Sequence, residues 1–127
     1  MARHKEIPVI RVCEITPMMN FAYVRLSGNV ERKPFVGKND GKIDYLSFSI
    51  NDGTGNLRVA AYDNVAREIV EMNLLPKEGV YVDVAGSLRV EADGRTKLYL
   101  GSSSLLSIVS PKGPMGAVSG FKSGESL

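Results

Sequence analysis

The sequence predicts an all-β fold, a small closed barrel of five strands with one short helix between the third and fourth strands. Most of the chain alternates apolar and polar residues with a period of two, and only one segment has helical periodicity. Glycines also occur inside two of the predicted strands, where a closed barrel has to bend sharply. The length of 127 residues suits one compact domain, and 43% hydrophobic with 24% charged residues is ordinary for a globular protein.

The first predicted strand covers residues 23–30, because its apolar residues alternate with polar ones and describe one buried face. Gly28 lies on the apolar side of this strand and marks a bulge or a bend. Residues 33–42 contain Pro34 together with several Gly, Asn and Asp residues. We therefore expect a loop in this region.

The second and third predicted strands cover residues 43–50 and 57–62. They flank a turn that contains Asp52-Gly53, and two alternating runs around an Asp-Gly turn are a strong indication of a β-hairpin. Alternation assigns one face of each strand to the barrel interior. The interior side chains are Leu46, Phe48, Ile50, Leu57, Val59 and Ala61.

The rest of the domain is predicted to contain a short helix and two more strands. An apolar stripe indicates a helix over residues 65–72, with Asp63 or Asn64 as its cap. Alternation then returns over residues 80–90, where Gly86 is a second candidate bend, and again over residues 97–100. A last apolar stretch follows at residues 105–109.

Composition sets the domain boundaries. The barrel domain is assigned to residues 21–109. Residues 1–20 form an N-terminal arm in which residues 8–15 are a possible extra strand. Residues 110–127 are predicted to be a flexible tail, because Gly, Ser and Pro account for ten of the eighteen residues there.

The polar inventory excludes several function classes. Cys13 is the single cysteine and His4 the single histidine. The chain therefore does not have the residues needed for an intramolecular disulfide, for a metal site built from several Cys or His ligands, or for a Ser–His–Asp triad. We expect no enzymatic activity, no cofactor and no metal, and we expect Cys13 to be a small buried residue. No apolar run approaches a membrane span and no signal-peptide pattern is present, so we expect a cytoplasmic protein without membrane contact.

Three runs of sequence resemble a known family. They are VRLSGNV at residues 24–30, DGTGNLRV at residues 52–59 and VDVAGSLRV at residues 82–90. They are similar to the matching strands in the OB-fold domains of replication protein A and of its archaeal single-strand-binding counterparts. The resemblance implies a five-stranded Greek-key OB-fold barrel and non-catalytic binding of single-stranded nucleic acid, with DNA preferred. It further implies a role in DNA replication or repair and association with the nucleoid.

The candidate binding surface is the outer face of the second and third strands, which OB-folds use for oligonucleotides. Aromatic rings there would stack on bases, and neighbouring cations would contact phosphates. Residues 25–45 carry net positive charge and residues 52–83 net negative charge, so we expect phosphates to approach the first loop and to avoid the helix. This face presents Tyr45, Ser47, Arg58 and Tyr62, extended by Arg95, Lys97 and Tyr99 and by Lys33, Phe35, Lys38 and Lys42 of the first loop.

Other interpretations stay open at this point. Tyr45 and Tyr62 are also ordinary strand formers on an exposed sheet face, and the loop lysines are also consistent with solvated charges. The alternative functions are a protein-interaction or assembly module and an RNA- or tRNA-binding domain. In the first, residues 8–15 would pair with a sheet edge of a second copy or of another OB-containing subunit.

Overall fold

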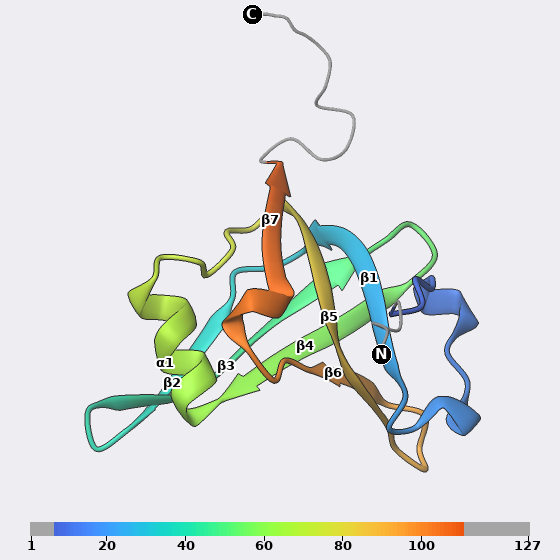
Figure 1. Ribbon diagram of the computed structural model, residues 1–127, viewed down its shortest axis with the longest axis horizontal. Helices are drawn as coiled ribbons and strands as arrows, with labels where there is room; N and C mark the ends of the chain where they lie inside the picture. Colours follow the sequence, from blue (N-terminus) through green and yellow to red (C-terminus); the bar gives the residue numbers. More distant parts are fainter. Residues whose placement is uncertain (1–6, 111–127) are drawn as a thin grey trace, which may run out of the picture.

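The computed structural model describes residues 7–110 of the chain (Figure 1). It contains seven strands, one α-helix and three short 3-10 helices. The strands are β1 (Tyr23–Val30), β2 (Phe35–Asn39), β3 (Lys42–Asn51), β4 (Asn56–Tyr62), β5 (Tyr81–Val90), β6 (Thr96–Tyr99) and β7 (Leu106–Ser110). The helices are η1 (Val12–Glu14), η2 (Pro17–Met19), α1 (Asp63–Glu71) and η3 (Ser103–Leu105).

Five of the strands close into a ring, which confirms the predicted architecture. The order is β1-β3-β4-β6-β5, and β5 pairs again with β1. Strands β4 and β6 are parallel, whereas the other pairs in the ring are antiparallel. Strand β7 pairs with the first half of β5, beyond the segment that pairs with β6, and so continues the same edge. The long crossover from β4 to β5 carries α1, as the sequence predicts.

The barrel interior is filled by aliphatic side chains from every strand of the ring. All six residues assigned to it from the predicted hairpin are buried. Burying a side chain such as Leu or Val contributes about 1.5–3 kcal/mol, so this cluster is the main source of stability. The largest fully buried side chains are Leu26, Leu46, Ile50, Leu57, Ile69, Leu88, Leu98, Val24, Val30, Val59, Val82 and Val84.

The two mid-strand glycines lie where neighbouring backbones approach closely. A Cβ atom added to Gly28 would lie 2.7 Å from the carbonyl oxygen of Asn51. A Cβ atom added to Gly86 would overlap the carbonyl oxygen of Tyr99 and come within 2.8 Å of a Leu98 methyl group. Glycine is therefore required at both positions by the packing of strand against strand.

The prediction of a loop over residues 33–42 is wrong, because part of this region forms strand β2. Strand β2 pairs antiparallel with β3, and Asn39 lies opposite Lys42. The connection is the two-residue turn Asp40-Gly41, in which both residues have positive φ (54° and 76°). A tight turn of this kind matches the right-handed twist of the flanking strands, so it favours a hairpin over an open loop.

The helix is confirmed, but its predicted capping is wrong. Helix α1 begins at Asp63, and Tyr62 occupies the N-cap position without a side-chain capping bond. The Asn64 side chain accepts a hydrogen bond from Arg67 at 2.6 Å. This carboxamide oxygen therefore serves the arginine and not the free N–H groups at the start of the helix.

The N-terminal arm packs on the barrel, but not as a strand. Val9 makes one isolated parallel bridge to Arg25, and residues 12–14 form the 3-10 helix η1. The backbone N–H of Val12 donates to the Asp52 carboxylate at 2.8 Å, which ties the arm to the β3–β4 turn. Cys13 is exposed, so its predicted burial is wrong.

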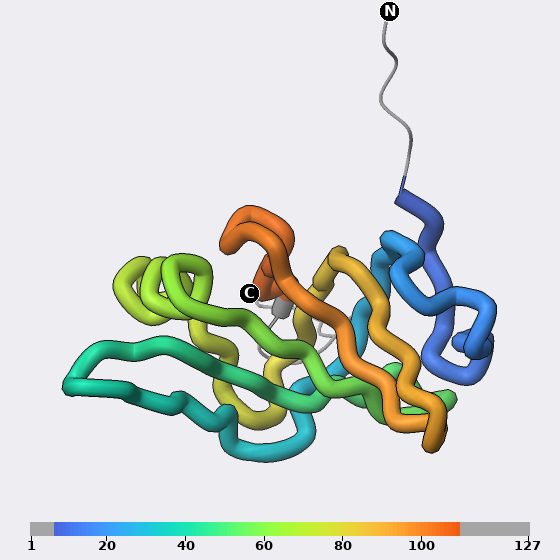
Figure 2. Tube along the Cα trace, turned by 90° about the horizontal axis from the view of Figure 1, so that it is seen from below, coloured from blue at the N-terminus to red at the C-terminus, as the bar shows by residue number. Residues whose placement is uncertain are grey.

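The helix and the N-terminal arm lie at opposite ends of the barrel (Figures 1 and 2). Both views place the β2–β3 turn beside α1, and Figure 2 shows the arm beside the β3–β4 turn. The predicted flexible tail, apart from Ser110, lies outside the described residues. Within residues 7–110, no helix has the length and apolar character needed to cross a membrane.

Candidate nucleic-acid interface

Three tyrosines form a contiguous row on the outer face of β3, β4 and β6. Tyr45 lies opposite Tyr62 in the β3–β4 pair, and their ring centroids are 5.0 Å apart. Tyr62 and Tyr99 follow at 5.4 Å. Each ring sits within the range of favourable aromatic contacts, so the protein holds the rings in place through its own sheet.

The row continues at both ends. Phe35 of β2 lies 6.0 Å from Tyr45, ring to ring, and it is 59% exposed. At the other end, the Arg89 guanidinium lies 4.7 Å from the centroid of Tyr99 and 4.7 Å from the centroid of Phe21. A planar guanidinium stacks on aromatic faces, so Arg89 links the two rings. The aromatic row is Phe35, Tyr45, Tyr62, Tyr99, Arg89 and Phe21.

Sequence reasoning missed Phe21 and Arg89. Arg89 alternates with the buried Leu88 in β5, so its outward direction was readable from the strand pattern. Its position is fixed by a hydrogen bond to the Ser87 hydroxyl at 2.6 Å. Phe21 gave no such signal, because it precedes β1 in a left-handed conformation with φ of 74°. Its backbone N–H donates to the Leu88 carbonyl at 2.8 Å, which places the ring beside Arg89.

Basic side chains flank the row. Arg58 is exposed and lies opposite Ser49 in β3 and Lys97 in β6. Its guanidinium donates to the Ser47 hydroxyl at 3.2 Å. Ser47 itself is only 2% exposed, so the expectation that it contributes to the open surface is wrong. The serine instead positions the arginine, because its hydroxyl accepts the hydrogen bond from Arg58.

A shallow cavity connects these cations to the tyrosines. Its volume is about 510 Å³. The Lys97 ammonium lies 5.8 Å from the Tyr99 centroid, and Arg95 pairs with Asp93 at 2.7 Å in the β5–β6 turn. The cavity is lined by Tyr45, Arg58, Arg95, Thr96 and Lys97.

Tyr62 has a lower tendency to ionise than a free tyrosine. Burial, followed by the neighbouring Tyr99 hydroxyl, raises the pKa of Tyr62 to about 12. The phenol is therefore neutral at physiological pH, with no negative charge to repel a phosphate. A row of aromatic rings flanked by cations suits a ligand with flat bases and an anionic backbone.

The lysines predicted for the first loop separate into two places. Lys38 and Lys42 lie at the β2–β3 turn, where they line a second cavity with residues of α1. Lys33 lines another cavity with Pro34 and Lys77. The structure therefore brings Tyr45, Tyr62, Tyr99, Phe35, Arg58, Arg95 and Lys97 together, whereas it does not bring Lys33 to this surface.

No resident metal is suggested by the side chains that the structure describes. Among residues 7–110, no three His, Cys, Asp or Glu side chains gather closely enough to hold an ion.

Comparisons with known proteins identify the fold. No family model matches the sequence, and no curated protein sequence matches it. The second OB-fold domain of replication protein A from Methanococcus maripaludis matches the structure with a TM-score of 0.54 at 18% identity, over 80% of this chain and 94% of that domain. The chain folds as an OB-fold. This result confirms the resemblance inferred from the three strand sequences.

Two further OB-fold matches are a tRNA synthetase and a protein-binding OBody. Asparaginyl-tRNA synthetase from Pyrococcus horikoshii matches with a TM-score of 0.57 at 20% identity, over 80% of this chain and 23% of the synthetase. An OBody bound to hen egg-white lysozyme matches with a TM-score of 0.59 at 15% identity, over 84% of this chain and 98% of the OBody. At these identities the likeness establishes the fold alone.

Proposed function

We propose that this OB-fold domain binds single-stranded nucleic acid, with DNA preferred, and that it does so without catalysis. The observation that carries the proposal is the aromatic row, in which consecutive ring centroids from Phe35 to Tyr99 are 5.0–6.0 Å apart. Bases have flat faces that stack on such rings irrespective of sequence, at about 1–3 kcal/mol per base. Duplex bases are already stacked on each other, so the row favours single strands.

Phosphates would contact the cations beside the row. Arg58 and Lys97 face each other across the β4–β6 pair, next to the cavity that Tyr45 also lines. The whole chain carries a net charge of only +2, so non-specific attraction contributes little. We therefore expect modest affinity with a shallow salt dependence, since few phosphates are neutralised.

The similar structures support testing both DNA and RNA. One belongs to a protein named for replication and another to an enzyme named for its tRNA, and both have this fold. A role in DNA replication or repair and a cytoplasmic, nucleoid-associated location are part of the proposal.

The decisive experiment is a fluorescence anisotropy titration at low salt. The probes are labelled oligonucleotides of about 16 nucleotides, the upper site size of one OB-fold, as single-stranded DNA, as single-stranded RNA and as duplex DNA. We expect the order single-stranded DNA, then RNA, then duplex. Equal binding of the duplex and the single strand would contradict the stacking mechanism, and absence of binding to all three would reject the proposal.

A protein-binding function is the second candidate. The OBody bound to lysozyme shows an OB-fold in contact with a protein. In this chain β7 pairs only with β5 within the described residues, and it exposes Ile108 and Val109. An edge strand with apolar side chains can pair with a strand of another subunit. Size-exclusion chromatography with light scattering distinguishes the two candidates, because a defined oligomer that binds no oligonucleotide would favour the second.

A further inference from the structure

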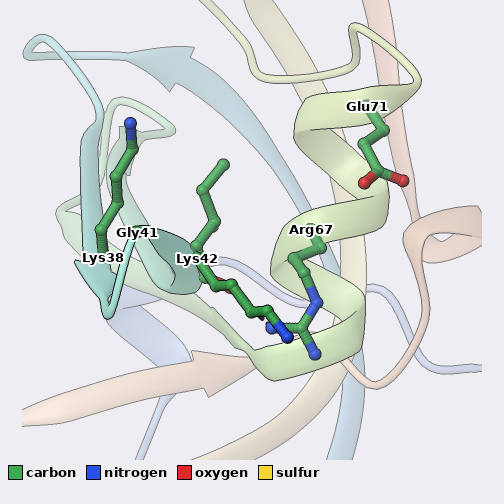
Figure 3. Close-up of a pocket in the computed structure, with 6 residues that line it drawn as sticks. Lys38, Gly41, Lys42, Arg67 and Glu71 are labelled. Atoms are coloured by element: carbon green, nitrogen blue, oxygen red, sulfur yellow. Dashed lines mark hydrogen bonds between the residues drawn. The ribbon is translucent and has the colours of Figure 1, made fainter.

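A second cavity lies at the end of the barrel that carries the helix, between the β2–β3 turn and α1 (Figure 3). Its volume is about 450 Å³, and it opens to the surface. The β2–β3 hairpin contributes four of its lining residues and α1 contributes two. The lining residues are Lys38, Gly41, Lys42, Ile43, Arg67 and Glu71.

The charges in this cavity are unbalanced. It has three basic side chains and one acidic side chain. Within residues 7–110, the ion pairs are Arg11–Glu14, Arg25–Asp83 and Arg95–Asp93, so none of these three cations has a carboxylate partner there. Figure 3 shows the Lys42 side chain pointing toward the Arg67 guanidinium. Two cations directed at each other repel unless an anion lies between them.

Arg67 is held in place before any ligand arrives. Its guanidinium donates to the Ile43 carbonyl at 2.9 Å and to the Asn64 side chain at 2.6 Å. These contacts use two of its five N–H donors and leave the others for a ligand. A guanidinium fixed in this way loses little conformational entropy when it binds an anion. The contact with Ile43 also fixes the β2–β3 hairpin against the helix.

The cavity lies to one side of the aromatic row, near Tyr45. Strand β3 begins at Lys42, and β4 ends at Tyr62, where α1 follows directly. With a rise of about 3.3 Å per residue, the Cα atom of Lys42 lies about 10 Å along β3 from that of Tyr45. A nucleic-acid strand with a base stacked on Tyr45 would therefore meet the cavity by running along β3 toward Lys42, to the side of the row and away from Phe35, which lies opposite Ser47.

We infer that this cavity binds a phosphodiester group of the same nucleic-acid strand, with Lys42 and Arg67 as its ligands. The inference rests on the proposed function, and it adds part of α1 to the proposed nucleic-acid interface. It reverses the expectation from sequence that phosphates avoid the helix. That expectation used the summed charge of the segment, whereas the tertiary structure directs Arg67 toward Lys42 of the hairpin.

The first test compares Lys42→Ala with Lys77→Ala, which removes the same charge from an exposed lysine that lines another cavity. For an oligonucleotide of about 16 nucleotides, Lys42→Ala should weaken binding about threefold to tenfold and should reduce the slope of log K against log salt by about 0.7, the value for one lost phosphate contact on a single strand. Lys77→Ala should change neither quantity. For the shortest oligonucleotide that still binds, Lys42→Ala should also have no effect, because that strand ends before the cavity.

The second test removes a negative charge from the cavity, which should favour binding of a phosphate. Glu71→Gln removes the one carboxylate that lines the cavity, and Glu68→Gln removes an exposed carboxylate of the same helix that does not line it. We expect Glu71→Gln to tighten binding of the long oligonucleotide and Glu68→Gln to leave it unchanged. Equal effects of the two variants would overturn the site, since a general field effect would then explain both.

The two proposals fail in different ways. If the long oligonucleotide binds, Tyr62→Ala weakens it and Lys42→Ala behaves like Lys77→Ala, then the phosphate site is wrong and the aromatic row stands. If no oligonucleotide binds the wild-type chain, then the proposed function is wrong, and the phosphate site falls with it.

Discussion

The rings of Tyr45 and Tyr62 are cross-strand neighbours on the β3–β4 pair, with their centroids 5.0 Å apart and their planes tilted by 47°. Their backbones are fixed by the barrel, so the distance between the rings is set by strand pairing. A ligand that stacks on them does not have to order the binding surface first. The entropic cost of binding is lower for that reason.

Replacing Tyr62 with Ala should weaken binding of single-stranded oligonucleotides about tenfold, because one stacked base contributes about 1–3 kcal/mol. Tyr62 is 38% exposed, so the substitution opens no internal cavity and the fold should persist. Anisotropy titrations measure the affinity, and circular dichroism checks the fold. Tyr23→Ala is the matched control, since Tyr23 is also exposed but makes no ring contact with the row. Equal losses for the two variants would remove Tyr62 from the site.

Replacing Arg89 with Ala should also weaken binding, and Arg89→Lys should not restore it. The guanidinium lies between Tyr99 and Phe21 at 4.7 Å from each ring centroid, and an ammonium group has no flat face to stack there. We expect both variants to lose at least about fivefold in affinity, the lower limit of one stacking contact. Full affinity in Arg89→Lys would show that the positive charge alone matters.

Replacing Gly86 with Ala should destabilise the barrel. The added methyl group would overlap the Tyr99 carbonyl oxygen, which belongs to the paired strand β6, and such overpacking costs about 1–3 kcal/mol. Gly101→Ala is the control, because nothing lies within 4 Å of a Cβ atom at that position. Its free energy of unfolding should stay within about 0.5 kcal/mol of the wild type. Urea unfolding measures both, and an unchanged Gly86→Ala would contradict the close approach of the two strands.

The stability of the protein should depend on Tyr62 at alkaline pH. Folding raises the pKa of Tyr62 from 10.0 to about 12. The unfolded chain therefore releases this proton first, so the contribution is complete below pH 10 and is lost as the pH rises to 12. Over this interval the Tm of the wild type should fall more steeply than that of Tyr62→Phe, which has no phenol at this position. Parallel curves would contradict the raised pKa.

The hairpin formed by β2 and β3 was not predicted from the sequence. Asp40-Gly41 is a good two-residue turn, but the polar and glycine-rich residues before it favoured a loop. Strand β2 has only one partner within the described residues and exposes Phe35, so it lacks the buried alternation that identified the other strands. Edge strands of this kind depend on the neighbouring backbone for their structure, and a single sequence carries little information about them.

Sequence alone determined the barrel and the outward tyrosines of β3, β4 and β6. Alternation with a period of two assigns each side chain to a face, and the small residues Gly28 and Gly86 mark where strands cross closely. Only the tertiary structure decided which outward residues are neighbours. Phe21 meets Arg89, and Arg67 approaches Lys42, across separations in the chain that no local pattern reports. Local periodicity fixes the direction of a side chain, whereas strand pairing and packing of the helix fix the distance between two of them.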